Sequence, residues 1–191
     1  YLNSEETALF YKKKNLYGLN FARKSKRDGI IICEGYMDVI SMHQAGFDNT
    51  VASLGTAYTS EQAALIKRYT DKIFLAYDSD GAGTNAALKA IDISKNAGLL
   101  VRVITMTPYK DPDEFIKNLG KDAYEERVQE AMSATMFRLA ILARNVNMND
   151  PGERTEFHQK MAQVLAQIEE KIERDNYIEA AANEYMVDQK A

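Results

Sequence analysis

The chain has 191 residues, of which 46% are apolar and 27% are charged, with 24 basic and 28 acidic side chains. This length allows one or two domains that each bury a core. No apolar run approaches the roughly 18 residues that a membrane helix needs, so we expect a soluble, cytoplasmic protein without a membrane partner. One cysteine and two histidines exclude a disulfide framework and leave too few ligands for a structural zinc.

The net charge of −4 is distributed unevenly along the chain. Residues 1–30 carry seven basic and three acidic side chains, whereas residues 31–118 and 119–191 are net acidic, at −3 and −5. The first thirty residues therefore form a basic part of an otherwise acidic chain. This asymmetry is a first indication of contact with an anionic partner.

The basic residues include a run of Lys12, Lys13 and Lys14, which Tyr11 and Tyr17 flank. A basic run is by default a solvated surface. Lysines beside aromatic side chains, however, suit contact with phosphates and stacking against bases. These side chains are therefore candidates for contact with a nucleic acid or a nucleotide.

Residues 29–106 alternate between short apolar runs and helical patterns. A continuous β-branched run is expected of a strand that is buried on both faces. Strands that alternate with helices of this length indicate parallel βαβ units, so we expect an α/β fold. We predict strands at 29–33, 50–53, 72–77 and 99–106, and helices at 36–44, at 60–69 with Ser60 as N-cap, and up to about residue 97.

The last third of the chain has a different pattern. From about residue 121, apolar residues recur at helical spacing, as in Met136, Leu139 and Ala143, and a turn signal at 149–152 interrupts them. We therefore expect an all-helical subdomain after the α/β part.

Acidic side chains follow three of the predicted strands. In parallel α/β sheets, ligands bind at the carboxyl ends of the strands, and five carboxylates come from this edge: Glu34, Asp78, Asp80, Asp111 and Asp113. Such crowding is unfavourable without a compensating cation. Hard divalent cations bind all-oxygen ligands of this kind. The pattern predicts metal-assisted phosphoryl transfer, with Glu34 near the reacting centre.

Some of these acids also have a purely structural interpretation. Asp111 precedes Pro112 and further acids, which is a typical helix N-terminus. The segment 78–83 can be a simple turn from strand to helix, because a lone Gly-x-Gly is weak evidence for phosphate binding. Glu34, directly after a buried strand and before a glycine, caps no obvious helix.

A recognisable combination of motifs occurs in four segments of the chain, namely residues 32–38, 52–56, 77–83 and 110–113. In this order and at these spacings, they resemble the Toprim domain of bacterial primases of the DnaG type. The resemblance implies a Rossmann-like parallel sheet with flanking helices, followed by an all-helical subdomain. It also implies three domains. Residues 1–28 would be the end of the amino-terminal polymerase subdomain, residues 29–120 the Toprim domain, and residues 121–191 the helical carboxy-terminal subdomain of the catalytic core.

The resemblance implies synthesis of short RNA primers from ribonucleoside triphosphates on a single-stranded DNA template, with one to three Mg²⁺ or Mn²⁺ ions. Zinc would belong only to a module absent from this chain. By position in the motifs, Glu34 and Lys12 are the expected catalytic residues. The expected metal ligands are Glu34, Asp78, Asp80, Asp111 and Asp113. The expected contacts with nucleotide or nucleic acid are Lys13, Lys14, Tyr17, Gly55 and Thr56.

The chain departs from the family pattern in two places. Ser79 stands where the family has a glycine between two aspartates, and the lysine that the family has just before Tyr1 is not in this sequence. We therefore expect the isolated fragment to be inactive or weakly active. The resemblance also implies contacts with a replicative helicase and with single-strand-binding protein, mostly through regions absent here.

Two alternatives remain open at this point. A Toprim domain can be a scaffold that binds DNA or a protein partner without catalysis, and Toprim domains also occur in nucleases and topoisomerases. The complete set of five acids favours catalysis over the scaffold.

Overall fold

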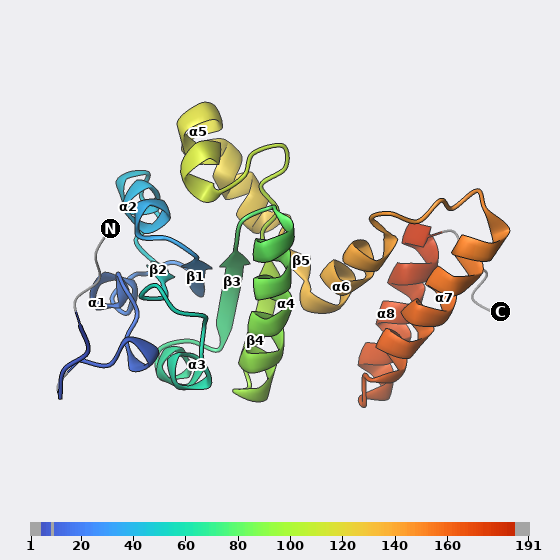
Figure 1. Cartoon of the computed structure of the whole chain (residues 1–191), viewed down its shortest axis with the longest axis horizontal. Helices are drawn as coiled ribbons and strands as arrows, with labels where there is room; N and C mark the ends of the chain where they lie inside the picture. The colour runs from blue at the N-terminus through green and yellow to red at the C-terminus, as the bar shows by residue number, and fades with distance from the viewer. Residues whose placement is uncertain (1–4, 9, 186–191) are drawn as a thin grey trace. The chain divides into compact units, whose positions relative to one another are not determined.

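A computed structural model describes residues 5–8 and 10–185 of the chain (Figure 1). It divides into two compact units, residues 1–132 and residues 133–191. The first unit is the α/β part. Among the described residues, no helix combines the length and the apolar character that crossing a membrane requires.

The first unit contains a five-stranded sheet in the order β2-β1-β3-β4-β5, in which β1 to β4 are parallel. The order means that the chain first adds β2 on one side of β1 and then crosses over to β3 on the other side. The strands are β1 (Ile30–Cys33), β2 (Thr50–Ala52), β3 (Lys72–Ala76), β4 (Leu100–Val103) and β5 (Met132–Ser133). The four predicted strands are confirmed, whereas β5 was not predicted, because two residues are too few for a periodic pattern.

The helices of the first unit alternate with these strands, as the α/β prediction required. They are η1 (Lys12–Lys14), α1 (Leu19–Ala22), α2 (Tyr36–Gln44), α3 (Ser60–Lys67), α4 (Gly81–Asn96) and α5 (Pro112–Gln129). The predicted cap of α3 was wrong by one residue. The hydroxyl of Thr59, not that of Ser60, accepts the Gln62 N–H, and the Gln62 side-chain oxygen in turn accepts the Thr59 N–H. This reciprocal capping box satisfies two backbone N–H groups, whereas a lone serine cap would satisfy only one.

The two faces of the sheet are buried by different helices. One face of β1 and β3, which includes Ile31 and Phe74, packs under α2 and α5. The helices α3 and α4 pack together, and α4 packs against β4 (Figure 1). Burial of β1 on both faces explains its continuous apolar sequence.

The helix α5 continues past the position where we predicted the end of the first domain. Gly120 has φ 80° and ψ −175°, which is not helical, so two helical segments meet at a kink there. Beyond the kink, Tyr124 is fully buried and packs on Phe47 and Phe115. The residues after 120 therefore belong to the core of the first unit, and the division into units falls later, between Met132 and Ser133.

The second unit is helical, with α6 (Ala134–Ala143), α7 (Pro151–Ala166) and α8 (Lys171–Tyr185). Its core is formed by Leu139, Phe157, Met161, Leu165 and Ala181. The turn signal at 149–152 marks the start of α7, where Asp150 caps the helix and Pro151 occupies its first position.

Candidate active site

The carboxyl ends of β1 and β3 bring Glu34 and Asp78 together. Cys33 pairs with Ala76 in the sheet, so the residues that follow each strand leave the same edge side by side. The Asp78 N–H donates to Glu34 Oε1 at 3.0 Å. Glu34, for which the sequence offered no structural role, therefore ties together the ends of two strands.

Asp80 and Asp111 each cap the helix that follows them. Asp80 Oδ1 accepts the Gly83 N–H at 2.8 Å, and Asp111 Oδ1 accepts the Glu114 N–H at 2.8 Å. The capping interpretation of Asp111 is therefore confirmed. Capping occupies only one oxygen of each carboxylate, so it does not exclude a second role for either residue.

The loop after β4 is fastened to the loop after β3. The Ser79 N–H donates to the Lys110 carbonyl at 2.8 Å, and Ser79 Oγ donates to the Tyr109 carbonyl at 3.1 Å. These two bonds hold Asp111 close to Asp78 across the sheet edge. The departure from glycine at Ser79 thus adds a hydroxyl contact between the loops.

The partner of Asp78 is a lysine. Lys110 Nζ lies 3.3 Å from Asp78 Oδ2. The remaining oxygens Glu34 Oε2, Asp78 Oδ1, Asp80 Oδ2 and Asp111 Oδ2 have no hydrogen-bond or ion-pair partner within residues 5–8 and 10–185. Four carboxylates at one edge therefore each keep one oxygen that can accept a ligand.

The pKa values of two of these acids reflect partial burial and mutual repulsion. Burial raises the pKa of Glu34, and the charges of Asp78 and Asp80 raise it further, against the opposing bond from the Asp78 N–H. Burial also raises the pKa of Asp78, and Lys110 opposes that effect. The edge thus holds more negative charge than its protein partners neutralise.

The donor chemistry of this edge fits a divalent cation. Carboxylates with unpartnered oxygens are the ligands that Mg²⁺ and Mn²⁺ take. Among the described residues, no three His, Cys, Asp or Glu side chains already converge as the ligands of one ion. The acids are therefore assembled at one edge, but their side chains are not arranged as a finished coordination sphere.

Asp113 differs from the other four acids. Its Oδ1 accepts the Ser41 hydroxyl, and its Oδ2 accepts Lys117 Nζ at 2.6 Å. Burial raises its pKa, but the bonds from Lys117 and Ser41 outweigh burial and lower that pKa overall. Both oxygens of Asp113 have protein partners, so its assignment as a metal ligand stays a prediction that the geometry supports less than the others.

Asp38 is a buried acid of this edge that the sequence analysis did not select. Its side chain is 7% exposed, and its Oδ2 accepts the Gly35 N–H at 3.1 Å. Burial is the main cause that raises its pKa to about 6, and the charges of Asp111 and Asp78 add to it. The sequence did contain a signal for this bond between Asp38 and Gly35. Asp38 lies three residues after Gly35, at a position where an acid commonly caps the start of a helix.

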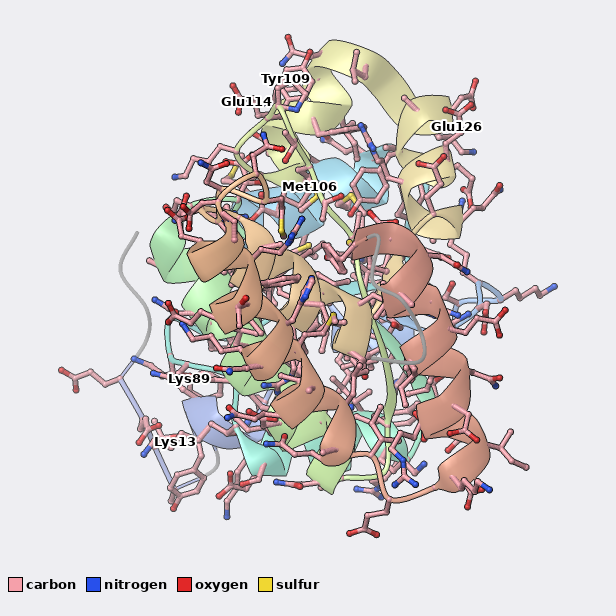
Figure 2. The ribbon with its side chains drawn as sticks, turned by 90° about the vertical axis from the view of Figure 1, so that its right-hand side faces the viewer. Lys13, Lys89, Met106, Tyr109, Glu114 and Glu126 are labelled. Atoms are coloured by element: carbon pink, nitrogen blue, oxygen red, sulfur yellow. The ribbon has the colours of Figure 1, made fainter. Side chains whose placement is uncertain are left out.

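The basic segment lies away from the acids. Buried Gln62 of α3 donates from Nε2 to the carbonyls of Lys12 and Asn15, at 3.2 and 2.8 Å. Figure 2 shows Lys13 at the opposite end of the first unit from Tyr109, which follows β4. No contact between this segment and an acid of the edge occurs in the described part of the chain, so the catalytic role of Lys12 stays a prediction, as do the roles of Lys13 and Lys14.

Tyr17 pairs with β2, the strand at one edge of the sheet, and Thr56 follows that strand in the chain. The Tyr17 N–H donates to the Ala52 carbonyl at 2.8 Å, and the Tyr17 ring lies 4.8 Å from the ring of Tyr36, two residues after Glu34. Thr56 Oγ1 is buried and has no hydrogen-bond partner among the described residues. Gly55, next to it, has φ +69°, a conformation that glycine adopts readily.

Comparison with known families gives matches in both units. A family described as Toprim-like matches residues 31–116, and a family described as the DnaB-helicase binding domain of primase matches residues 135–189. The second match differs from our expectation, which placed the helicase contact mostly outside this chain.

Curated relatives and solved structures agree with these matches. The chain is 42% identical over 192 residues to a DNA primase from Clostridium acetobutylicum and 37% identical over 190 residues to one from Listeria innocua. These alignments cover 100% and 97% of the chain but 32% and 30% of the relatives. The chain thus spans about a third of the length of the curated relatives that it matches.

The solved structures cover both units of the chain. A DnaG primase catalytic domain bound to single-stranded DNA is similar with a TM-score of 0.75 and 31% identity, over 95% of this chain and 60% of that one. The RNA polymerase domain of the Mycobacterium tuberculosis primase, in complex with a DNA duplex that has a 6-nucleotide overhang, is similar with a TM-score of 0.83 and 26% identity. That alignment covers 98% of this chain and 61% of the other.

Proposed function

We propose that the chain is the Toprim-containing part of the catalytic core of a bacterial DNA primase, as its family and structure matches indicate, and that it supplies the metal-binding edge of a primase active site. The reaction is synthesis of a short RNA primer from ribonucleoside triphosphates on a single-stranded DNA template, in the cytoplasm. The observation that carries the proposal is the set of four carboxylates at one sheet edge that each keep an unpartnered oxygen.

In this proposal, Glu34, Asp78, Asp80 and Asp111 hold one or more Mg²⁺ or Mn²⁺ ions. Such ions lower the pKa of an attacking hydroxyl and neutralise charge on a leaving pyrophosphate. The chain itself positions the ligands. The bond from the Asp78 N–H orients Glu34, and the two helix caps fix the rotamers of Asp80 and Asp111. Preorganised ligands need no costly rearrangement when the substrate arrives.

Other residues are proposed to bind the nucleotide and the nucleic acid. The buried Thr56 hydroxyl can donate to a phosphate oxygen, and its lack of a partner among the described residues supports this role. Tyr17 is 38% exposed and can stack against a base. Lys12, Lys13 and Lys14 supply positive charge for a phosphate backbone at a distance from the acids.

A chimera tests the catalytic proposal. This chain replaces the matched residues of the Clostridium acetobutylicum primase, and incorporation of labelled ribonucleotides is measured on a single-stranded template. Asp78→Asn should lower the rate at least about a hundredfold, since it removes a ligand charge at the reacting centre. The control is Asp122→Asn, an exposed acid of α5, which should leave the rate within about twofold. Priming by the Asp78→Asn chimera at the parent rate would contradict the proposal.

A second function is proposed for the helical unit on the basis of the family match at residues 135–189. We propose that this unit contacts a replicative helicase of the DnaB type. Fluorescence anisotropy of labelled residues 133–191 with purified bacterial DnaB should show saturable binding, and residues 1–133 should show none. Contact with single-strand-binding protein stays a prediction.

The scaffold alternative makes the opposite prediction for metal. A scaffold that binds DNA or a protein without catalysis has no use for the unpartnered oxygens at the edge. Saturable Mn²⁺ binding that Asp80→Asn weakens would therefore support the catalytic proposal, and a complete lack of Mn²⁺ binding would support the scaffold.

A further inference from the structure

One positively charged side chain lies among the acids of the edge. Lys110 Nζ is 3.3 Å from Asp78 Oδ2, and the lysine directly precedes Asp111 in the chain. The side chain of Lys110 is 60% exposed, whereas that of Asp78 is only 19% exposed. An ammonium group therefore approaches a largely shielded carboxylate from the solvent side.

The backbone of Lys110 is fixed by contacts that do not involve its side chain. Its carbonyl accepts the Ser79 N–H at 2.8 Å, and its own N–H donates to Glu114 Oε2 at 2.8 Å. The neighbouring Tyr109 carbonyl accepts Ser79 Oγ at 3.1 Å. The loop is thus anchored on both sides of the lysine, so the long side chain can swing into solvent while the loop stays in place.

We infer that Lys110 is a built-in competitor of the metal ion: its ammonium neutralises Asp78 while the edge is free of metal, and it must move away when a divalent cation binds. The inference rests on the proposed metal site and assigns a regulator of its affinity. Among the described residues, Lys110 is the basic side chain paired with one of the four acids that keep an unpartnered oxygen.

The physical argument is one of charge and exchange. An ammonium is a compact, mobile charge on a flexible stem, so it can stabilise a carboxylate without holding it rigidly. An ion pair whose lysine is held from the solvent side contributes little free energy, so a divalent cation can displace it. The displacement nevertheless reduces the metal affinity, and a positive charge that stays nearby repels the ion further. Lys110 therefore raises the metal concentration at which the edge is filled.

Direct Mn²⁺ titration of the 191-residue chain tests this inference without any measurement of activity. Free Mn²⁺ is followed by electron paramagnetic resonance at about 0.1 M KCl, where charges more than about 10 Å apart are largely screened. The variants are Lys110→Gln, Lys110→Arg and Lys89→Gln. Lys89 is an exposed lysine of α4 that has no hydrogen-bond or ion-pair partner within residues 5–8 and 10–185, and it lies well below the labelled Tyr109 and Glu114 in Figure 2.

Lys110→Gln should bind Mn²⁺ about three- to tenfold more tightly than the parent chain, because it removes the competing charge and the ion pair. Lys110→Arg keeps the charge and should bind within about twofold of the parent, as should Lys89→Gln. Circular dichroism melting of each variant verifies that the fold is kept.

The outcomes separate the inference from the proposed function. An unchanged or weaker Mn²⁺ affinity in Lys110→Gln, with clear binding by the parent chain, would overturn the competitor role and leave the metal site standing. Equal tightening in Lys110→Gln and Lys89→Gln would also overturn it, because the effect would then be one of net charge alone. Lack of Mn²⁺ binding by every protein would overturn both the inference and the metal site.

Discussion

Gly83 shows how one residue shapes the turn that carries Asp78 and Asp80. A Cβ atom at Gly83 would overlap the Asp78 carbonyl oxygen and would lie 2.8 Å from the Asp78 Cβ. The glycine is therefore required because the first turn of α4 packs directly on the backbone of the acidic loop. The sequence alone had suggested only a weak resemblance to a phosphate-binding Gly-x-Gly.

We predict that Gly83→Ala lowers the free energy of unfolding by about 2–3 kcal/mol, as overpacking of a tight backbone contact does. Gly81→Ala is the matched control, since a Cβ there meets nothing within 4 Å. It should be neutral or slightly stabilising, because alanine favours a helix more than glycine does. Urea unfolding of both variants measures the difference, and equal losses would contradict the close-contact explanation.

Asp38 makes the stability of the chain depend on pH. Its pKa is raised from 3.8 to about 6 in the folded state, so folding favours its protonated form. The stability that this preference contributes is fully present below about pH 4 and is lost as the pH rises through about 6. For a shift of this size, the loss is up to about 3 kcal/mol.

Asp38→Asn cannot ionise, so it should remove this part of the pH dependence. Urea unfolding in EDTA at several values between pH 4 and pH 7.5 should show a flatter profile for the variant than for the parent chain. Glu34 and Asp78 also have raised pKa values, and they contribute a slope of the same sign to both proteins. Parallel profiles would show that Asp38 is not the group responsible.

At the scale of the elements, α5 joins the site to the core. Its first residues follow the capping Asp111, and its second half places Tyr124 between Phe47 and Phe115, with ring centroids at 4.9 and 5.6 Å. The Tyr124 hydroxyl is buried and has no hydrogen-bond partner among the described residues. A buried hydroxyl without a partner has lost its hydration and gained nothing in return.

We predict that Tyr124→Phe raises the free energy of unfolding by about 1 kcal/mol, because it removes this unsatisfied group and keeps the ring. Tyr58→Phe is the contrasting variant, since the Tyr58 hydroxyl accepts a bond from buried Ser94. That change should lower the free energy of unfolding by about 0.5–1 kcal/mol. Thermal and urea unfolding distinguish the two, and a loss in Tyr124→Phe equal to that in Tyr58→Phe would contradict the prediction.

Most of these elements could be predicted because their signals are local. The range of α2 was predicted to the residue, from Tyr36 to Gln44. Gly35 precedes this amphipathic run and Gly46 follows it, so both of its ends are marked in the sequence. The kink at Gly120 was not predictable in the same way. A glycine with positive φ ends many helices, and only the packing of Tyr124 into the first core decides that the helical segment beyond Gly120 belongs to the first unit.

At the scale of the whole molecule, the two units have separate cores. The apolar cluster of the first unit includes Met42 and Phe115, and that of the second includes Leu139 and Phe157. All five predicted metal ligands lie in the first unit. The proposed metal chemistry and the proposed helicase contact therefore belong to different units.

We predict that residues 1–133, which keep β5 complete, bind Mn²⁺ with an affinity within about twofold of that of the whole chain. The physical reason is that every proposed ligand and Lys110 are held by contacts inside the first unit. Mn²⁺ titration of the fragment is the measurement, with circular dichroism as the control for folding. Loss of binding in a folded fragment would show that the second unit contributes to the site.

The amino-acid sequence was sufficient to predict the α/β class, the four parallel strands and the edge from which the acids project. These features follow from hydrophobic periodicity and from the rule that parallel strands present their carboxyl ends together. Which oxygens are left free was decided only by the tertiary structure. The oxygens of Asp113 accept bonds from Ser41 and Lys117, buried Asp38 accepts the Gly35 N–H, and Lys110 pairs with Asp78. Ser41 and Asp113, like Lys110 and Asp78, lie far apart in the chain, and local sequence patterns do not encode contacts of this kind.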